Sequence, residues 1–356
     1  MSGWEKNVRR TAVYVPGEQP KEKGIIKLNT NECPYPPAPG VREQLQRMDY
    51  EDFRLYPAPD AAELTETLAE YYRVEPSQVF VGVGSDDVIA MAFLTFFNGD
   101  RPILFPDVTY SFYDVWAQVY RIPYIQCPLG DDMRIQAQDY MQENGGIIFP
   151  NPNAPTGILE PVSLIEDIVR QNPDVVVMID EAYIDFGGRS CLELVDRYDN
   201  LLVIRTFSKS RAMAGMRIGF AIGSKKLIAC LQSTKYAINS YTMNQPALTL
   251  GVAAVTDEAY FRKRIGQIIS TREWVKEELR AMGFQFPDSY GNFVFATHPA
   301  VPAEVIFSRL KQQGIYVRHW QKPRIENYLR ITIGTDQEME ALLKALKLII
   351  KKGEIS

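Results

Sequence analysis

Residues 205–217 read RTFSKSRAMAGMR. This stretch follows an apolar run, and its lysine, Lys209, stands between two serines with Arg217 eight residues further on. A lysine amine condenses with an aldehyde and serves as a base once it is released, while a guanidinium beside hydroxyl groups suits a phosphate. Most lysines of a soluble protein are solvated surface residues, so a chemical role for Lys209 depends on what the rest of the chain provides.

Short apolar runs alternate with helical stretches around this segment. We expect buried strands at residues 79–81, 103–105, 147–149, 175–179 and 201–204, and helices at residues 61–73, 86–97, 111–120, 162–171 and 225–233. Apolar strands separated by helices are typical of a mostly parallel sheet that is covered on both faces. The sequence therefore predicts an α/β fold.

The pattern changes from about residue 245. A helical stretch over 246–282, broken near Thr256-Asp257, precedes alternating apolar segments at 292–296 and 328–333 and an amphipathic helix at 339–351. We expect residues 41–245 to form a large domain and residues 246–356 a smaller α+β domain. Residues 1–40 are rich in proline, glycine and charge, and we expect an arm that packs on the small domain or on a partner subunit.

Composition excludes several classes of protein. A net charge of −5 does not favour nucleic acid or an anionic membrane. The four cysteines lack paired spacing and the chain has only two histidines, which argues against a disulfide framework, a metal centre and a Ser-His-Asp triad. The polar first residues lack the apolar core of a signal peptide, and no run approaches the roughly 18 apolar residues of a membrane span. We expect a cytoplasmic protein without a metal.

Three further segments lie at the ends of predicted strands. Residues 81–87, VGVGSDD, open a helix, and their glycines would let backbone N–H groups approach an anion. Residues 151–157, NPNAPTG, form a stiff turn where open α/β sheets place ligands. Either segment could also be a plain structural turn. The first segment, residues 81–87, lacks the Gly-Lys-Ser/Thr ending of a P-loop.

The third segment delivers Asp180 at the tip of an apolar strand, with Tyr183 three residues on. A carboxylate in such a place is costly unless a cation pairs with it, and a protonated ring nitrogen would be such a partner. The alternative is that Asp180 caps the next helix.

The order of these motifs resembles that of the fold-type I pyridoxal-phosphate aminotransferases. The similarity is greatest to the histidinol-phosphate aminotransferases and extends from Leu28-Asn29-Thr30-Asn31-Glu32 to Tyr328-Leu329-Arg330-Ile331-Thr332. It implies a large domain with a seven-stranded type of sheet, a small α+β domain and pyridoxal 5'-phosphate as cofactor.

The resemblance also implies catalytic roles. Lys209 would form a Schiff base with the cofactor and then carry a proton between the substrate and the cofactor. Asp180 would keep the pyridine nitrogen protonated. Tyr183 would donate to the ring oxygen, and Tyr110 would stack on the ring.

Binding roles follow in the same way. The implied phosphate ligands are the backbone of Ser85 and Asp86 with Thr206, Ser208 and Arg217. Tyr56 would reach the phosphate of a neighbouring subunit, which implies a homodimer. Arg330 would bind the anionic end of the substrate, with Tyr14, Asn31 and Arg318 in the same pocket.

One position departs from the family pattern. Many relatives have Asn-Asn-Pro-Thr-Gly, whose second asparagine bonds the ring oxygen of the cofactor, and here that position is Ala154. Neighbouring residues of a tight turn point in different directions, so Asn153 does not simply replace it. We expect Tyr183 to carry more of the interaction, with Asn153 or a water assisting.

The implied activity is ping-pong transamination between L-glutamate and imidazole acetol phosphate, in histidine biosynthesis. An aromatic amino-acid aminotransferase would use the same pocket. A threonine-phosphate decarboxylase would share every cofactor residue and would release carbon dioxide without an oxo-acid acceptor. A regulator that only binds the cofactor would need a DNA-binding domain, which the short arm does not provide.

Overall fold

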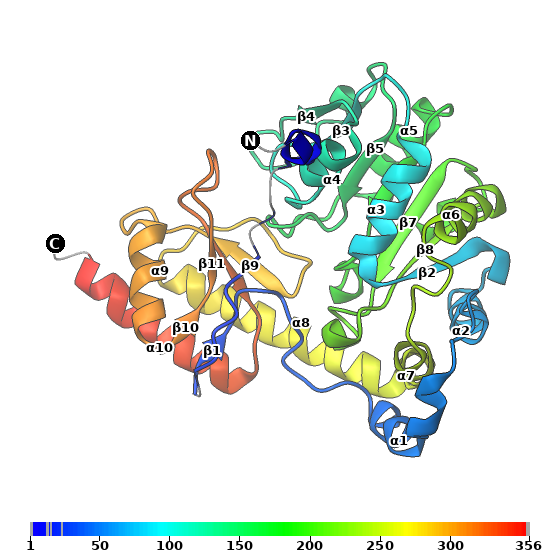
Figure 1. The fold of residues 1–356 in the computed structure, drawn as a ribbon. Coiled ribbons are helices and arrows are strands. Elements are labelled where there is room, and N and C mark those ends of the chain that lie inside the picture. Colours follow the sequence, from blue (N-terminus) through cyan, green and yellow to red (C-terminus); the bar gives the residue numbers. More distant parts are fainter. Residues whose placement is uncertain (1–2, 12–13, 15, 23, 354–356) are drawn as a thin grey trace.

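The structure is a computed structural model that describes residues 3–11, 14, 16–22 and 24–353. Two units lie side by side (Figure 1), and the larger is built on a seven-stranded sheet with the order β2-β8-β7-β6-β5-β3-β4. All neighbours pair in parallel except those of β8, which is antiparallel to both β2 and β7. The predicted α/β class with a mostly parallel sheet is confirmed.

The strands of this sheet are β2 (Val79–Gly82), β3 (Ile103–Pro106), β4 (Tyr124–Cys127), β5 (Ile147–Pro150), β6 (Val177–Asp180), β7 (Leu201–Thr206) and β8 (Gly219–Gly223). Its helices are α1 (Pro39–Arg47), α2 (Ala62–Tyr72), α3 (Gly84–Phe96), α4 (Tyr113–Tyr120), α5 (Val162–Gln171), α6 (Lys225–Ile238) and α7 (Gln245–Thr256). The five predicted strands and five predicted helices of this region are confirmed, whereas α1, β4 and β8 were not predicted.

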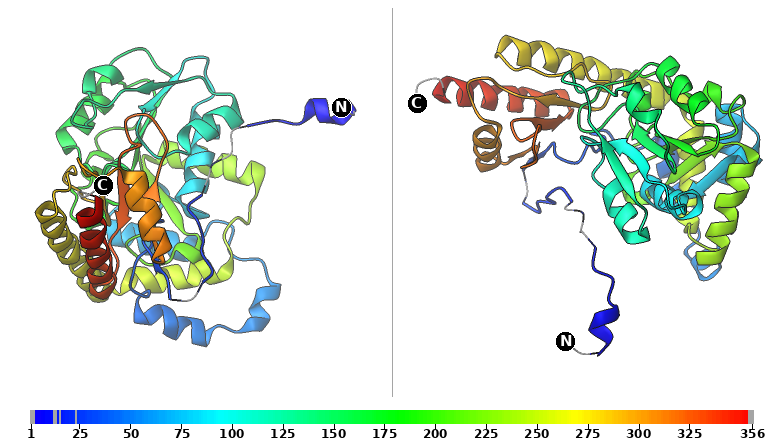
Figure 2. Two further views of the ribbon diagram at one scale, coloured as in Figure 1. Left: turned by 90° about the vertical axis from the view of Figure 1, so that its left-hand side faces the viewer. Right: turned by 90° about the horizontal axis from the view of Figure 1, so that it is seen from above.

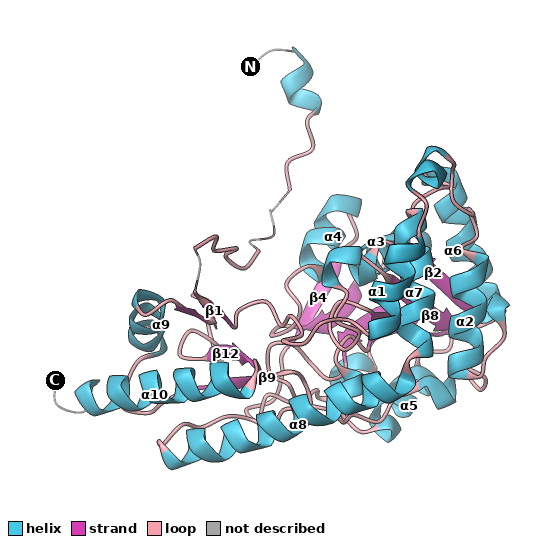
Figure 3. Ribbon diagram, turned by 90° about the horizontal axis from the view of Figure 1, so that it is seen from below, coloured by secondary structure: helices cyan, strands magenta, loops and turns pink. Residues whose placement is uncertain are grey.

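Alternation along the strands divides the large unit into two cores. Met178 faces a core that α3, α4 and α6 complete, while Val177 and Ile179 face a second core with α2, α5 and α7. Successive residues of a strand point to opposite faces, so strands buried on both faces are apolar at every position. Figure 3 shows the sheet enclosed between helices.

The small unit contains α9 (Ala303–Gln312), α10 (Asp336–Gly353) and a three-stranded antiparallel sheet of β11 (Arg318–His319), β12 (Leu329–Thr332) and β9 (Phe293–Ala296). The long helix α8 (Glu258–Ala281) extends along both units (Figures 1 and 3).

The two hydrophobic cores bear on the boundary between the units, which we expected at residue 245. Ala247 and Val255 of α7 are buried in the core of the large unit, whereas Ile265 and Ile268 of α8 are buried in the core of the small unit. We therefore propose that the boundary lies near Asp257, because α7 packs with α1 and α2 and only α8 contributes to the second core.

The N-terminal segment contacts both units. β1 (Ile26–Lys27) pairs in parallel with β10 (Ile315–Tyr316) of the small unit, and Tyr14 stacks on Phe112 of the large unit, with 4.1 Å between ring centroids. The first described residues, from η1 (Gly3–Asn7), extend away from the body in both views of Figure 2. Within the described ranges, the helices are too short or too polar to cross a membrane.

Candidate active site

Two adjoining cavities lie between the carboxyl ends of the large sheet and the small unit, and Lys209 lines both of them. The inner cavity, about 180 Å³, is lined by Ser85, Asp86, Tyr110, Asp180, Tyr183, Thr206, Ser208 and Arg217 together with Thr30, Glu32, Ala154 and others. The outer cavity, about 200 Å³, is lined by Tyr14, Asn29, Arg318, Trp320 and Arg330 among others. Nine residues that the sequence analysis assigned to one cofactor site therefore lie around one cavity.

Lys209 lies in the tight turn that follows β7. Ala212 N donates to the Lys209 carbonyl at 3.3 Å, and Met213 N donates to the Phe207 carbonyl at 3.0 Å. The Lys209 amine donates to the Thr30 carbonyl at 3.0 Å. These contacts hold the amine at the junction of the two cavities.

Asp180 ends β6 and is only 5% exposed. Its carboxylate accepts hydrogen bonds from Ala182 N (3.1 Å) and the Tyr113 hydroxyl (3.2 Å), both neutral donors. Burial raises the pKa of Asp180 to about 6, with Asp86 adding to the rise and both hydrogen bonds and Lys209 opposing it. A cation placed in the inner cavity beside this carboxylate would be strongly favoured.

A glycine-rich corner forms the far end of the inner cavity. Gly84 begins α3 with φ +84°, and a Cβ there would lie 2.5 Å from Nη2 of Arg217. A Cβ on Gly219 would lie 2.2 Å from the backbone N of Ser85. Gly84 thus lets Arg217, and Gly219 lets the start of β8, approach the N-terminus of α3. Free N–H groups and the helix dipole favour an anion there.

Asp86 links this corner to Tyr110. Its two carboxylate oxygens accept from the Tyr110 hydroxyl at 2.7 Å and from Arg217 Nη2 at 3.2 Å. Burial, and then the charge of Asp86, raise the pKa of Tyr110 well above its ordinary value, so this phenol stays protonated. Arg217 also donates to the Ser208 hydroxyl at 3.4 Å.

Arginines line the outer cavity. Arg330 on β12 donates from Nη2 to the Asn29 carbonyl at 3.1 Å, and its buried Nε has no hydrogen-bond partner in the described part of the chain. Burial lowers the pKa of Arg330, and nearby Arg318 acts in the same direction. A substrate carboxylate or phosphate would satisfy both the charge and the orphaned Nε.

Three residues assigned to the site do not line either cavity. Asn31 is fully buried and donates to the Tyr183 hydroxyl at 2.9 Å. The side-chain amide of Asn153 donates to the Val108 carbonyl and to Thr156 and accepts from Thr109. Tyr56 is 81% exposed and stacks on Tyr241.

The backbone accounts for the positions of the two asparagines. Asn31 adopts φ +57°, which turns its side chain away from the cavities that the adjacent Thr30 and Glu32 line. The turn at residues 151–157 points Ala154, not Asn153, into both cavities. The structure therefore does not place Asn31 against a substrate or Asn153 against a cofactor.

Other members of the site were not predicted from the sequence. Tyr113, which donates to Asp180, begins α4 three residues after Tyr110 and belongs to none of the motifs that mark the other site residues. Trp320 of the outer cavity lies 5.2 Å from the Arg330 guanidinium, and no local motif marks it. Among the described residues, no group of three His, Cys, Asp or Glu side chains could hold a metal ion.

Comparison with known proteins defines the class. The model of the family described as aminotransferase class I and II matches residues 23–346. The chain belongs to this aminotransferase family, whose members depend on pyridoxal phosphate.

Within that family, the chain is a member of the histidinol-phosphate aminotransferases. It is 49% identical to the histidinol-phosphate aminotransferase of Lactococcus lactis subsp. cremoris (strain SK11), over 99% of each chain. It is 52% identical to histidinol-phosphate aminotransferase 1 of Hydrogenovibrio crunogenus, over 98% of each chain.

Solved structures share the fold. The histidinol-phosphate aminotransferase from Sinorhizobium meliloti, in complex with pyridoxal-5'-phosphate, matches with a TM-score of 0.84 over 92% of this chain and 91% of that one, at 22% identity. The aspartate aminotransferase from Thermus thermophilus with maleate matches with a TM-score of 0.78 over 91% of each chain, at 19% identity. At these identities the likeness concerns the fold.

Proposed function

We propose that this protein transfers the amino group between L-glutamate and imidazole acetol phosphate, which yields histidinol phosphate and 2-oxoglutarate. The observation that carries the proposal is the position of Lys209 between a cavity with a buried carboxylate and a cavity with unsatisfied arginine. The near-full-length identity to histidinol-phosphate aminotransferases supports the choice of substrate.

The inner cavity fits pyridoxal phosphate. When bound, this group supplies an aldehyde for amines and a protonated ring that withdraws electrons. Asp180, buried beside neutral donors, would pair with the ring nitrogen, and the glycine corner with Arg217 would hold the phosphate. Thr206 and Ser208 line the same cavity and would add hydroxyl donors.

Lys209 would act as the base in the proton transfer. Its amine is held by the Thr30 carbonyl at the junction of the two cavities, within reach of a substrate that enters from the outer one. Tyr110 lines both cavities and would lie against the face of the ring. Because the Tyr110 hydroxyl is bonded to Asp86, its ring orientation is set before any ligand binds.

Tyr183 would serve the ring oxygen in place of the missing asparagine. Its hydroxyl accepts from Asn31, which leaves its own proton free for the ring oxygen. We therefore propose that Asn31 orients Tyr183, and that Asn153 shapes the turn that presents Ala154. A spectrophotometric titration of the holoenzyme tests whether this arrangement changes the protonation of the cofactor.

The substrate would bind in the outer cavity. Arg330 and Arg318 can each receive a carboxylate or a phosphate, because a guanidinium forks onto either anion. Tyr14 and Trp320 line the same cavity with aromatic rings, which suits a planar imidazole. Aromatic amino acids would meet the same surfaces, and they form the nearest alternative donors.

The exposed position of Tyr56 supports a homodimer. Tyr56 and Tyr241 stack on the surface together with other exposed apolar side chains, including Tyr50, Phe53 and Leu55. Exposed apolar groups gathered in this way are typical of interfaces. We propose that Tyr56 reaches the phosphate in the partner's site, and that the dimer works in the cytoplasm.

A panel of amino donors tests the substrate. The holoenzyme is mixed with histidinol phosphate, phenylalanine, tyrosine or threonine phosphate, and the absorbance of the cofactor is followed through a single half-reaction. Histidinol phosphate is expected to convert the cofactor with the highest second-order rate constant. A higher constant for phenylalanine or tyrosine would contradict the assignment. So would carbon dioxide release from threonine phosphate without an oxo-acid.

A further inference from the structure

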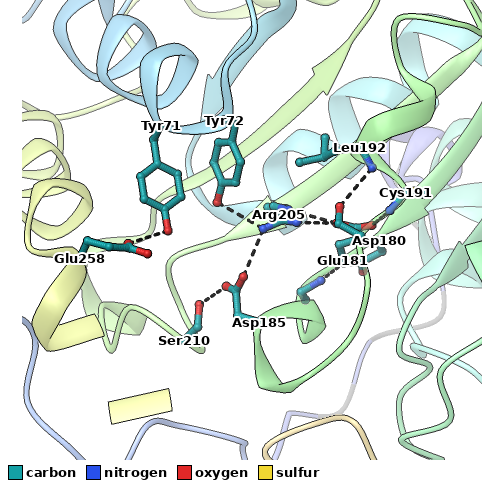
Figure 4. Close-up of polar contacts among 12 residues, drawn as sticks. Tyr71, Tyr72, Asp180, Glu181, Asp185, Cys191, Leu192, Arg205, Ser210 and Glu258 are labelled. Carbon is teal, nitrogen blue, oxygen red and sulfur yellow. Dashed lines mark hydrogen bonds and ion pairs between the residues drawn. The ribbon is translucent and has the colours of Figure 1, made fainter. Parts of the chain in front are cut away.

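A buried polar network lies behind the active site. Asp180 and Thr206 face the α3 side of the sheet and line the inner cavity, so the residues next to them, Glu181 and Arg205, point to the opposite side. Figure 4 shows Arg205 at the centre of this network, with Tyr72, Glu181 and Asp185 around it and Ser210 beyond Asp185.

The network is held by charge-assisted contacts. Arg205 donates to Glu181 Oε2 from Nη2 at 2.8 Å and from Nε at 3.1 Å, and to Asp185 Oδ1 from Nη1 at 3.2 Å. The side chains of Arg205 and Glu181 are 8% and 0% exposed. Such buried pairs tolerate little movement, since displacement of one member leaves an unpaired charge in the interior.

Ser210 connects this network to the Lys209 turn. Its hydroxyl donates to Asp185 Oδ2 at 2.6 Å, and Ser210 is only 5% exposed. Ser210 is the residue directly after Lys209, and it lies inside the turn that the Ala212 N to Lys209 carbonyl bond closes. The next residue, Arg211, anchors the same turn to the Ala254 carbonyl at 2.8 Å.

We propose that Ser210 is a positioning residue for Lys209. Ser210 bonds Asp185, Asp185 pairs with Arg205, and Arg205 pairs with Glu181, so this chain of contacts ties the turn that carries the lysine to the strand end that carries Asp180. The network thereby fixes the distance between the amine that moves the proton and the carboxylate at the ring nitrogen. This inference rests on the proposed transamination, in which Lys209 is the base.

The same network offers a matched control. Ser190 donates to Glu181 Oε2, also at 2.6 Å, but it lies in a segment that does not carry Lys209. Ser190→Ala and Ser210→Ala each remove one hydroxyl from a network carboxylate. If the network only stabilises the fold, the two variants should behave alike. If Ser210 positions Lys209, only Ser210→Ala should affect proton transfer.

The test is the single half-reaction of holoenzyme with L-glutamate and with α-deuterated L-glutamate. Ser210→Ala is expected to lower the rate about 10-fold and to raise the deuterium isotope effect, because a displaced amine makes proton transfer more rate-limiting. Ser190→Ala should leave the rate within about 2-fold and the isotope effect unchanged. Ser210→Thr, which keeps the hydroxyl, should restore most of the rate.

Two further measurements separate positioning from folding. The melting temperature and pyridoxal-phosphate affinity of the apoprotein should be similar for Ser210→Ala and Ser190→Ala. Asp185→Asn, which weakens the acceptor, should also raise the isotope effect. Equal rate losses in the two serine variants, or a loss with an unchanged isotope effect, would overturn the proposal. A wild-type enzyme that L-glutamate does not convert would refute the transamination, and this inference with it.

Discussion

The burial of Asp180 suits a cationic ligand but lowers the stability of the apoprotein. It is buried at a strand end among neutral donors, and burial raises its pKa to about 6. Its ordinary pKa is 3.8, so the folded apoprotein holds a proton between about pH 4 and pH 6 that the unfolded chain releases. The free energy of unfolding therefore falls as the pH rises through this window.

Asp180→Asn removes this penalty. Two pKa units correspond to about 3 kcal/mol, so the variant apoprotein should be more stable than the wild type by up to about 3 kcal/mol above pH 6. The difference should shrink to near zero below about pH 4. Urea unfolding of both apoproteins at a series of pH values measures it. If the variant is no more stable than the wild type at pH 8, the wild-type apoprotein already offsets the cost of burying the charged carboxylate.

At the scale of residues, the sequence predicted which side chains gather but not where each one points. Lys209, Asp180 and Tyr183 could be predicted because they follow apolar strands, whose ends share one edge of the sheet. Asn31 and Asn153 could not be placed, since the left-handed backbone of one and the hydrogen bonds of the other are set by neighbours distant in sequence.

At the scale of elements, strands buried on both faces were predictable because every position is apolar. β8 escaped prediction: its five residues, Gly219–Gly223, include two glycines, and it directly follows the active-site loop. Gly219 has to be glycine because the start of α3 approaches it closely. The strand without a strong apolar pattern therefore helps to form the glycine-rich corner of the inner cavity.

The same corner yields a prediction for Gly84→Ala. Gly84 has φ +84°, which disfavours alanine by about 1–2 kcal/mol, and the added Cβ would displace Arg217. We expect pyridoxal phosphate to bind the variant about 10-fold or more weakly, by equilibrium titration of the apoprotein. Gly99→Ala, where a Cβ meets nothing within 4 Å, is the control and should keep wild-type affinity. Equal affinities for both variants would argue against a phosphate at this corner.

At the level of the whole molecule, we propose that the two hydrophobic cores, rather than the change of sequence pattern, mark the units. The change of pattern near residue 245 is the start of α7, but which core a helix joins depends on tertiary packing. The sequence predicted that the N-terminal arm packs outside the large unit. Its pairing with β10 could not be predicted, because β1 has only two residues and no sequence pattern marks it.

Sharing of sites between subunits can be tested by mixing inactive variants. Lys209→Ala and Tyr56→Ala subunits, refolded together in equal amounts, should form about half mixed dimers with one intact site each, so about a quarter of all sites recover. Activity is measured at a cofactor concentration that does not saturate Tyr56→Ala. Lys209→Ala mixed with Asp180→Ala is the control, because both residues belong to one chain's cavity. Recovery in the control, or none in the test mixture, would contradict a shared site.

We propose that Lys209 is the base of an aminotransferase acting on histidinol phosphate. Steady-state turnover of histidinol phosphate with 2-oxoglutarate, followed by L-glutamate formation, tests it in wild type and in Lys209→Ala. The wild type should give parallel double-reciprocal plots, as ping-pong kinetics require. Lys209→Ala should retain a spectroscopically visible cofactor and lose at least about 1,000-fold in kcat. Multiple turnovers by Lys209→Ala at a rate near that of the wild type would show that Lys209 is not the base.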